Sequence, residues 1–322
     1  MVAAKTLGMA LLGEHRYSEF VLRLSADDVG TGYFQLQIRM TLREGFETCM
    51  VDWGDGTLQN LKDYTISHNY VKKGQYFVRI GPEAKWWRLW AGLRVEGRYA
   101  TNVRPEIAPQ TWSDYLESCE GTYCGWSGVK GTPMPWGLSL TSTRCCYQAC
   151  DGIKGSVPSW SPNITDAAGT FSCCPRITGR VPQWGESIVN ASSCFEGCTG
   201  LWGIIPDWPD CCKTMNRCYR DCAGLDGVLP GWPFDCEEAD ETYRGCTGIR
   251  GNIRAWKPHM RAVSMCYMGC TGLTGAWTQD SRILMPEQQF GFRCYDVVTG
   301  ASESLRSLFW DDPWGGLVPR PN

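Results

Sequence analysis

Cysteine is the residue type whose number and spacing offer the most chemistry in this chain. The sequence contains 19 cysteines among 322 residues, together with only three histidines. Thiols in such numbers could form disulfides, bind metal ions or fill a reduced core. Three pairs are adjacent in the sequence, at Cys145–Cys146, Cys173–Cys174 and Cys211–Cys212. No Cys-x-x-Cys motif is matched by a second one, so the spacing argues against a zinc ribbon.

The positions of the cysteines favour the reduced core. Cysteine recurs every 24 residues, at Cys150, Cys174, Cys198, Cys222, Cys246, Cys270 and Cys294. A second position alternates between threonine and cysteine, at Thr122, Cys146, Thr170, Cys194, Cys218, Thr242 and Cys266. A cysteine that exchanges with threonine behaves as a small side chain that fills space. Two alternatives stay open: disulfides between adjacent repeats, which a spacing of ~5 Å would permit, and a metal site.

The other titratable residues give little indication of catalysis. Asp52 and Asp55 lie close together and could bind calcium or act as acids, but aspartate before glycine is ordinary in turns. His15, His68 and His259 fall in different segments. The sequence has no phosphate-binding glycine loop, no Gly-x-Ser-x-Gly motif and no His-Glu-x-x-His motif. We therefore predict a protein without enzymatic activity, cofactor or metal ion.

A repeat of 24 residues must position these cysteines. Tryptophan recurs at this interval without a slip, at Trp112, Trp136, Trp160, Trp184, Trp208, Trp232 and Trp256. Another aromatic residue recurs at Tyr123, Tyr147, Phe171, Phe195, Tyr219, Tyr243 and Tyr267. A constant interval over so many copies predicts a solenoid, in which equivalent side chains form columns.

Each repeat is expected to contain one short strand and a return limb. Aliphatic residue, glycine and aliphatic residue alternate, as at Ile177, Gly179 and Val181, and would point inward from an extended chain. Neighbouring strands would pair in a parallel sheet ~4.8 Å apart, and the glycine would leave room for an aromatic ring of the return limb. Apolar positions three apart, such as Ile188 and Ala191, predict a single helical or 3₁₀ turn in that limb.

The repeats resemble a known family. The segments CFEGCTGLWGIIPDW (Cys194–Trp208) and CYMGCTGLTG (Cys266–Gly275) are similar to the BspA-type leucine-rich repeat, where an aromatic residue, a cysteine and a leucine precede a short strand. The resemblance covers about residues 110–300. It implies a leucine-rich-repeat-type solenoid that mediates contacts without catalysis, as in extracellular adhesion and display proteins. The glycine inside the strand and the tryptophan after it depart from the family pattern.

Residues 17–82 follow a different pattern. Alternation in Phe34–Met40, a strand entering an Asp-Gly turn in Met50–Thr57, and a turn with a strand in His68–Ile80 predict β-structure. The motifs WGDGT and HxYxxxGxYxVxI resemble the PKD domain, an immunoglobulin-like β-sandwich. This resemblance implies that Trp53 and Tyr70 pack in the core between the sheets.

These patterns divide a mainly β chain with short helical turns into five segments. We expect an N-terminal arm (1–16), a PKD-like β-sandwich (17–82), a connector and solenoid cap (83–111), a solenoid of about seven to eight coils (112–298), and a C-terminal cap with an extended tail (299–322). Within the last segment, Ser302–Phe309 could form a short helix. The first residues imitate a secretion signal only faintly, because no small-x-small cleavage site follows, so we expect no export signal.

Composition limits the partners. A formal charge of -3 gives no basic excess for binding nucleic acid, and the apolar runs are far shorter than the ~20 residues of a membrane span. The glycosylation patterns at Asn163–Thr165 and Asn190–Ser192 would matter only if the chain enters a secretory pathway.

The variable positions of the predicted strand indicate a binding surface. Residues between the inward-facing ones differ from repeat to repeat, as in a binding face, although a merely solvated face would vary too. Trp202, Ile204 and Val228 form an apolar patch that a monomer has little reason to expose. The predicted binding residues are Arg180, Trp202, Ile204, Val228, Arg250 and Asn252.

The two resemblances and the reduced thiols lead to one hypothesis and one alternative. The hypothesis is a structural protein on the surface of a bacteriophage particle, as a capsid decoration protein, head fibre or tail fibre. It would be assembled in the host cytoplasm in many copies. Its partners would be other capsid or tail proteins, with a protein or glycan of the host surface. The alternative is an exported bacterial or protist adhesin, located outside the cell or on its surface.

Overall fold

The computed structural model describes residues 17–30, 32–41, 49–61, 65–82, 92–98, 105–252, 254, 257, 260, 262–263, 265–273, 309–311 and 317–319. Within these residues the protein is mainly β, and their one α-helix, α2 (Ala26–Val29), is a single turn capped by Ser25. The chain divides into an N-terminal part (residues 1–118 with 134–140) and a repeat part (residues 119–133 with 141–322). The expected arm at 1–16 lies outside the described residues.

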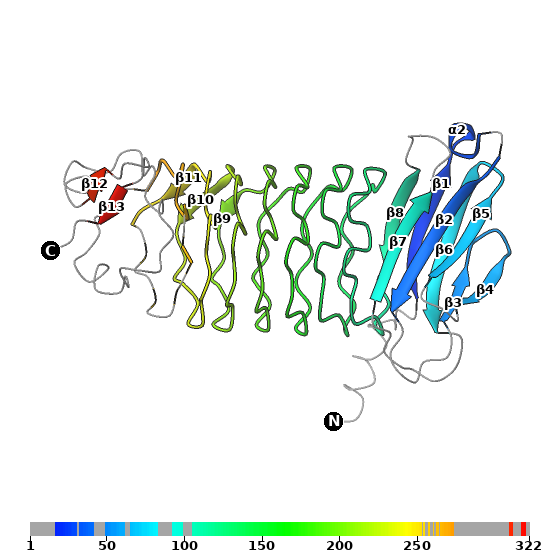
Figure 1. The fold of residues 1–322 in the computed structure, drawn as a ribbon, viewed down its shortest axis with the longest axis horizontal. Coiled ribbons are helices and arrows are strands. Elements are labelled where there is room, and N and C mark those ends of the chain that lie inside the picture. The colour runs from blue at the N-terminus through cyan, green and yellow to red at the C-terminus, as the bar shows by residue number, and fades with distance from the viewer. Residues whose placement is uncertain are drawn as a thin grey trace, which may run out of the picture. The chain divides into compact units, whose positions relative to one another are not determined.

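Two antiparallel sheets make up the N-terminal part (Figure 1). The larger sheet contains, in spatial order, β4 (Leu58–Leu61), β3 (Cys49–Asp52), β6 (Gly74–Pro82), β1 (Ser18–Leu24) and β8 (Glu106–Thr111). The smaller sheet contains β5 (Thr65–Tyr70), β2 (Phe34–Thr41) and β7 (Gly92–Arg98). Strands β2, β3 and β6 lie where the residue alternation predicts strands.

Alternating side chains of both sheets are buried in the N-terminal part. Leu22 of β1 and Leu36 of β2 are fully buried, as is Trp53, which follows β3. The hydroxyl of Tyr70, at the end of β5, donates a hydrogen bond of 2.9 Å to the carbonyl oxygen of Trp53. This bond ties the smaller sheet to the turn after β3, so the two sheets share a core.

The sheets extend beyond residue 82, where the sequence placed their end. The segment 83–111, expected to be a connector and cap, contributes β7, which pairs with β2, and β8, which pairs with β1. Both strands satisfy backbone groups of β1 and β2 that would otherwise form open sheet edges. Backbone pairing of this kind depends little on residue type, so the sequence of this segment did not predict these two strands. Its aromatic-rich composition favoured a cap instead.

As far as residue 273, the described residues of the repeat part form 24-residue repeats, each hydrogen-bonded to the next (Figure 1). One column of parallel bridges joins Gly131 to Ile153, Gly155 to Ile177, Gly179 to Leu201 and Gly251 to Leu273. In the middle of this column the bridges widen into a parallel sheet of β9 (Gly203–Ile204), β10 (Leu225–Val228) and β11 (Gly248–Arg250). A second column runs through Ser142, Asp166, Asn190, Thr214, Glu238 and Ala262 in the return limb.

The limb between these two columns has an unusual backbone. Alternate amides donate to the next repeat, as from Ala191 to Thr214 and from Ser193 to Asn216, at 2.8 and 2.7 Å. The amides between them close turns within their own repeat. This alternation puts two residues of each repeat at positive φ, and eight of them are not glycine: Cys145, Ala149, Cys173, Ser193, Arg217, Asp221, Glu241 and Met265. Such residues cost about 1–2 kcal/mol each, which the hydrogen bonds between repeats must offset.

Aromatic rings form columns inside the repeat part. The rings of Tyr123, Tyr147, Phe171, Phe195, Tyr219, Tyr243 and Tyr267 stack with centroids 5.6–6.0 Å apart. Trp184 stacks between Trp160 and Trp208 at 5.4 and 5.2 Å. The indole of Trp184 also donates to the hydroxyl of Tyr219 at 3.0 Å, which links the two columns. Trp112 and Trp136 stack at 6.5 Å within the N-terminal part.

One glycine recurs in every repeat for a different reason from the one expected. Gly131, Gly155, Gly179, Gly203, Gly227 and Gly251 have φ between 87° and 104°. A Cβ on Gly227 would lie 2.9 Å from Cγ2 of Ile204, an exposed side chain of the preceding repeat, and not against an aromatic ring. The expectation of a ring there is therefore wrong. Glycine is needed because other residues rarely adopt this φ, and because the outward side chain of the previous repeat lies over it.

The described C-terminal residues form a two-stranded antiparallel pair, β12 (Phe309–Asp311) with β13 (Leu317–Pro319). This pair falls in the segment where we expected an extended tail. The predicted helix at 302–309 and the last repeat position, Cys294, lie outside the described residues, apart from Phe309 itself, which begins β12.

Candidate binding surface

The repeated cysteines are hydrogen-bond donors in the core. Each thiol donates to the carbonyl oxygen of the aromatic residue 27 positions earlier, as from Cys198 to Phe171 and from Cys222 to Phe195, both at 3.0 Å. The six thiols of this column are fully buried: Cys150, Cys174, Cys198, Cys222, Cys246 and Cys270. The same carbonyl also accepts from a backbone amide, as Phe171 does from Cys174 at 3.1 Å, so the thiol adds a second bond in a space that only a small side chain fits.

The second cysteine position is also buried. Where threonine replaces cysteine, its hydroxyl bonds to two carbonyls, as from Thr242 to Met215 at 3.0 Å and to Ala239 at 2.8 Å. Cysteine and threonine at this position are therefore both small and fully buried. The sequence indicated the size of this side chain but not its hydrogen bonds.

Burial also makes the column thiols poor nucleophiles. It raises the pKa of Cys174 and of Cys270 to about 12, and it raises the pKa of Cys222 well above its ordinary value. All eighteen cysteines that the structure describes are free thiols. No group of three or more His, Cys, Asp and Glu side chains among the described residues is arranged to hold a metal ion. The column therefore belongs to the packing and offers no reactive centre.

The acidic pair near β3 stabilises a turn. Asp52 accepts from the amide of Gly54 at 2.9 Å, and Asp55 lies 2.7 Å from Nε2 of His68. Burial by itself raises the pKa of Asp55, but the hydrogen bonds from His68 and Thr57 outweigh it and hold that pKa below its ordinary value. His68 stacks on Trp53 with ring centroids 5.1 Å apart. All of these groups are engaged in holding the turn.

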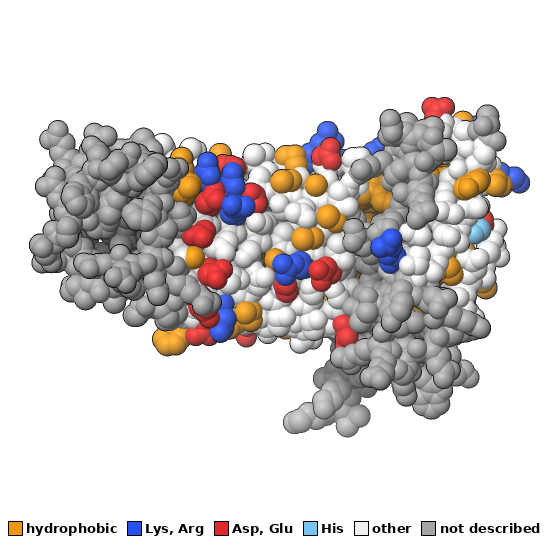
Figure 2. All heavy atoms as spheres, in the orientation of Figure 1, with side chains coloured by type: hydrophobic (Ala, Val, Ile, Leu, Met, Phe, Trp, Pro, Cys, Tyr) orange, Lys and Arg blue, Asp and Glu red, His pale blue; other side chains and the backbone are white. Residues whose placement is uncertain are grey.

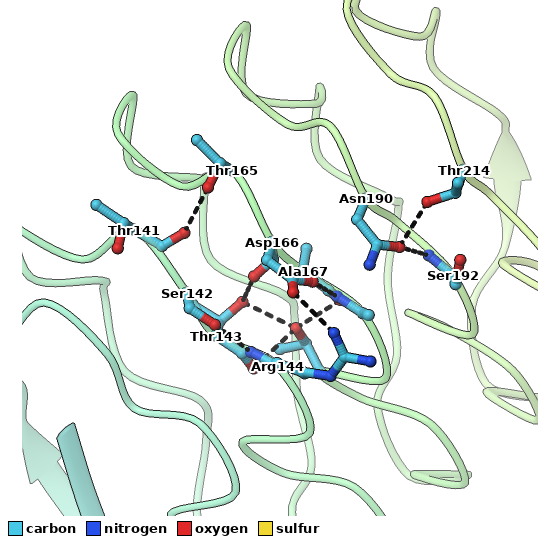
Figure 3. Close-up of polar contacts among 12 residues, drawn as sticks. Thr141, Ser142, Thr143, Arg144, Thr165, Asp166, Ala167, Asn190, Ser192 and Thr214 are labelled. Carbon is cyan, nitrogen blue, oxygen red and sulfur yellow. Dashed lines mark hydrogen bonds and ion pairs between the residues drawn. The ribbon is translucent and has the colours of Figure 1, made fainter. Parts of the chain in front are cut away.

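Polar side chains of the return limb pair with one another across repeats. Arg144 forms an ion pair of 3.0 Å with Asp166, whose carboxylate also accepts from a backbone amide (Figure 3). One repeat further on, Asn190 accepts from the hydroxyl of Thr214 at 2.9 Å (Figure 3). Similar pairs continue along the limb to a cluster around Glu241. We call all of these side chains the paired polar columns: Arg144, Asp166, Asn190, Thr214, Asn216, Glu238, Glu241, Arg217, Arg220 and Arg244.

Glu241 is the most heavily engaged member of these columns. Its buried carboxylate contacts Arg217 at 3.0 Å, Arg220 at 3.3 Å and Arg244 at 2.6 Å. Burial alone raises the pKa of Glu241, but the bond from Arg244 and the charges of Arg220 and Arg217 outweigh it and hold the pKa below 4.5. Figure 2 shows side chains of both charges next to one another over the repeats that carry β9, β10 and β11.

A second set of exposed residues lies along the column of β9, β10 and β11. These residues come directly before and after the glycine of each repeat, and all are exposed. We call them the variable face: Lys130, Thr132, Lys154, Ser156, Thr178, Arg180, Trp202, Ile204, Asp226, Val228, Arg250 and Asn252. The six predicted binding residues all fall in it, so the structure places them in one continuous series.

The apolar side chains of the variable face are among the most exposed in the protein. Trp202 is 50% exposed, and Ile204 and Val228 are each 63% exposed. The guanidinium of Arg180 lies over the indole of Trp202, with Cζ 5.3 Å from the ring centroid. The stem of Arg180 lies above Gly203, where a Cβ would be 3.4 Å from its Cγ. The outward side chain of one repeat thus packs over the glycine of the next repeat, where there is no Cβ to obstruct it.

Several polar side chains of the variable face have no partner in the part of the chain that the structure describes. Among the described residues, the side chains of Asp226, Arg250 and Asn252 have no hydrogen-bond or ion-pair partner. Sequence reasoning did not include Asp226, because the pattern of residue types cannot show which charges are paired. The signal that could have identified it is its register, since Asp226 occupies the position equivalent to Trp202 and Arg250.

The predicted column residues lie in the core. Trp136, Trp160, Trp184, Trp208 and Trp232 are buried, while Trp256 lies outside the described residues.

In the described part of the chain, no helix has both the length and the hydrophobicity needed to span a membrane. No protein-family model matches this sequence, and a search of curated proteins found no significant match.

Proposed function

We propose that this protein is a non-enzymatic binding protein that uses the variable face to contact its partner. In this proposal the repeats form one continuous solenoid of the BspA-like leucine-rich-repeat type, and the N-terminal sheets form a PKD-like, immunoglobulin-like sandwich. The proposal treats the repeats as a rigid support with a changeable surface. Repeat proteins commonly bind through such extended surfaces.

The exposed series from Arg180 to Asn252 carries this proposal. It combines three large exposed apolar side chains with polar groups that lack partners in the described structure. An exposed apolar patch of this kind is more often an interaction site than a surface that only contacts water. The side chains of the paired polar columns already bond to one another, so they have fewer free donors and acceptors with which to bind a ligand.

We place the protein on the surface of a bacteriophage particle, as a capsid decoration protein, head fibre or tail fibre. A column of buried free thiols is compatible with assembly in a reducing cytoplasm. The N-terminal sandwich would attach to capsid or tail proteins, and many copies would present the variable face to a protein or glycan of the host surface. The second candidate is a cell-surface adhesin, favoured by the adhesion families that the motifs resemble.

Peptide mass spectrometry separates these placements. We expect peptides of this protein in particles purified by density gradient, after extensive washing. Finding them only among proteins released by protease from intact cells would favour the adhesin. Finding them in neither fraction would contradict both placements.

Counting thiols provides an independent test of the compartment. A thiol-reactive probe applied in denaturant, without reductant, should label all 19 cysteines of the protein isolated from its natural source. A much smaller number of labelled sites would indicate disulfides and an oxidising compartment, which would favour the exported adhesin.

A further inference from the structure

We propose that the ligand of the variable face is an anionic glycan, with Trp202 as the surface on which a sugar ring stacks. This inference rests on the proposed binding role of the variable face and adds the chemical class of the ligand. It is argued from one aromatic platform, the charge around it and the polar groups left without partners.

Trp202 has the properties of a stacking platform. Half of its surface is exposed, and the guanidinium of Arg180 holds the indole from one side at 5.3 Å. A ring positioned in this way loses little freedom when it binds, which reduces the entropic cost of association. Sugar rings present flat arrays of C–H groups that pack on the face of an indole. Ile204 and Val228, in the adjacent positions, extend the apolar surface.

The charge of the variable face selects an anion. Its basic side chains are Lys130, Lys154, Arg180 and Arg250, and its one acidic side chain is Asp226, which gives a formal charge of +3. The whole chain has a formal charge of -3, so this face has the opposite sign to the protein as a whole. An anionic ligand would therefore be attracted to this surface in preference to the rest of the molecule.

The unpartnered polar groups favour a sugar over a simple polyanion. Asp226 and Asn252 can accept hydrogen bonds from hydroxyl groups, and both lack partners among the described residues. A ligand made only of carboxylates or phosphates would leave the carboxylate of Asp226 unsatisfied and would be repelled by it. A glycan with carboxylate or sulfate groups offers hydroxyls to Asp226 and charges to Arg180 and Arg250.

Two other classes of macromolecule fit this surface less well. Single-stranded nucleic acid stacks successive bases on several aromatic side chains, whereas Trp202 is the one aromatic residue among the twelve positions of the variable face. A stable protein partner would need about 800 Å² of buried surface with few charges at its centre. Here charged residues occupy positions on both sides of the apolar ones.

Binding of the full chain to immobilised polymers tests the proposal. The anionic glycans are polygalacturonate, hyaluronate and heparin, the neutral counterparts are methyl-esterified polygalacturonate and dextran, and the other polyanions are poly-glutamate and oligo(dT). We expect at least one anionic glycan to bind more tightly than the neutral polymers and the other polyanions. Trp202→Ala should weaken that binding roughly three- to tenfold, the loss of one stacking contact.

Matched variants separate stacking from general charge or exposure. Phe234→Ala removes an exposed ring that lies outside the variable face, and Lys213→Gln removes an exposed charge that pairs with Glu237. Neither should change binding, while Arg180→Gln with Arg250→Gln should abolish the preference for the charged glycan. Thermal unfolding of each variant checks that the fold is retained.

Failure of this inference differs from failure of the proposed function. If no anionic glycan binds, or if poly-glutamate or oligo(dT) binds equally well, the glycan assignment is wrong. If Trp202→Ala then still prevents attachment of particles or protein to host cells, the variable face binds something else and the proposed function stands. If Trp202→Ala alters neither kind of binding, both are wrong.

Discussion

The variable face and the paired polar columns belong to the same repeats, yet their polar side chains are used in opposite ways. In the paired polar columns, Glu241 contacts three arginines and Asn190 bonds to both Thr214 and a backbone amide. On the variable face, Asp226 and Arg250 have no such partners within the described structure. Within the described residues, one set of polar groups is therefore paired internally and these members of the other set are not.

This difference shows how a repeat can separate stability from recognition. The spacing of the repeats places equivalent residues next to one another, so a charge on one repeat can meet an opposite charge on the next. Along the return limb the sequence supplies such complements, as with Arg144 and Asp166. Along the variable face, Trp202 lies between Thr178 and Asp226 in equivalent positions, and no hydrogen bond joins these three described side chains. Changes there should alter binding while leaving the fold intact.

Both surfaces depend on the close approach of the repeats, and disrupting that approach should have a large effect on stability. A Cβ on Gly200 would clash with the carbonyl oxygen of Ile177 in the preceding repeat. We expect Gly200→Ala to lower the free energy of unfolding by about 2–3 kcal/mol, measured by denaturant titration. Gly231→Ala is the control, because a Cβ there has no atom within 4 Å. Equal effects of the two substitutions would contradict the observed packing.

Neutralising one carboxylate on each surface compares them directly. Glu241→Gln should lower the free energy of unfolding by about 1–2 kcal/mol, a value kept modest because the three arginines are partly exposed. Asp226→Asn should change it by less than about 0.5 kcal/mol, since Asp226 has no hydrogen-bond or ion-pair partner among the described residues. Thermal or chemical unfolding of the two variants measures the contrast. A larger loss for Asp226→Asn would reverse the assignment of the two surfaces.

The contrast should also depend on pH. Because the folded-state pKa of Glu241 lies below its ordinary value, its stabilisation is fully present well above that ordinary value and is lost as the pH falls through the folded-state pKa. The difference in unfolding free energy between the natural protein and Glu241→Gln should therefore shrink below pH 4.5. Equilibrium unfolding at several acidic pH values measures it, and a difference that stays constant would rule out the ion-pair explanation.

Trp202 should have only a small effect on stability for its size. Although tryptophan is the largest side chain, half of Trp202 is exposed and its described ring contact is with Arg180. We expect Trp202→Ala to change the free energy of unfolding by less than about 1 kcal/mol, whereas Phe195→Ala, in the stacked column, should cost about 3–5 kcal/mol. A large loss from Trp202→Ala would show that this side chain is structural.

The columns of the repeat could be predicted from the sequence because position alone determines them. A fixed interval of 24 residues brings Phe171 next to Phe195, and Cys174 near Cys198, whatever the detailed backbone path. The outward direction of Trp202 followed from its place between two positions of the predicted strand, Leu201 and Gly203, that were expected to face inward. These features depend on register and on the sorting of apolar side chains into the core.

The backbone path and the pairing of charges could not be predicted in this way. Ser193 and Glu241 adopt positive φ although neither is glycine, because bonds to adjacent repeats override their local preference. The glycine of the variable face was expected to accommodate a ring but instead seats an outward side chain such as Ile204. Likewise, β7 pairs with β2 in one sheet and β8 pairs with β1 in the other, through backbone hydrogen bonds that side-chain types do not reveal.

A crystal structure of the full chain tests the central claim most directly. The account predicts that the rings from Tyr123 to Tyr267 stack at 24-residue intervals with centroids 5.6–6.0 Å apart, and that Trp202 lies exposed under Arg180. Rings that do not stack in this order, or a buried Trp202, would contradict both the repeat architecture and the binding surface derived from it.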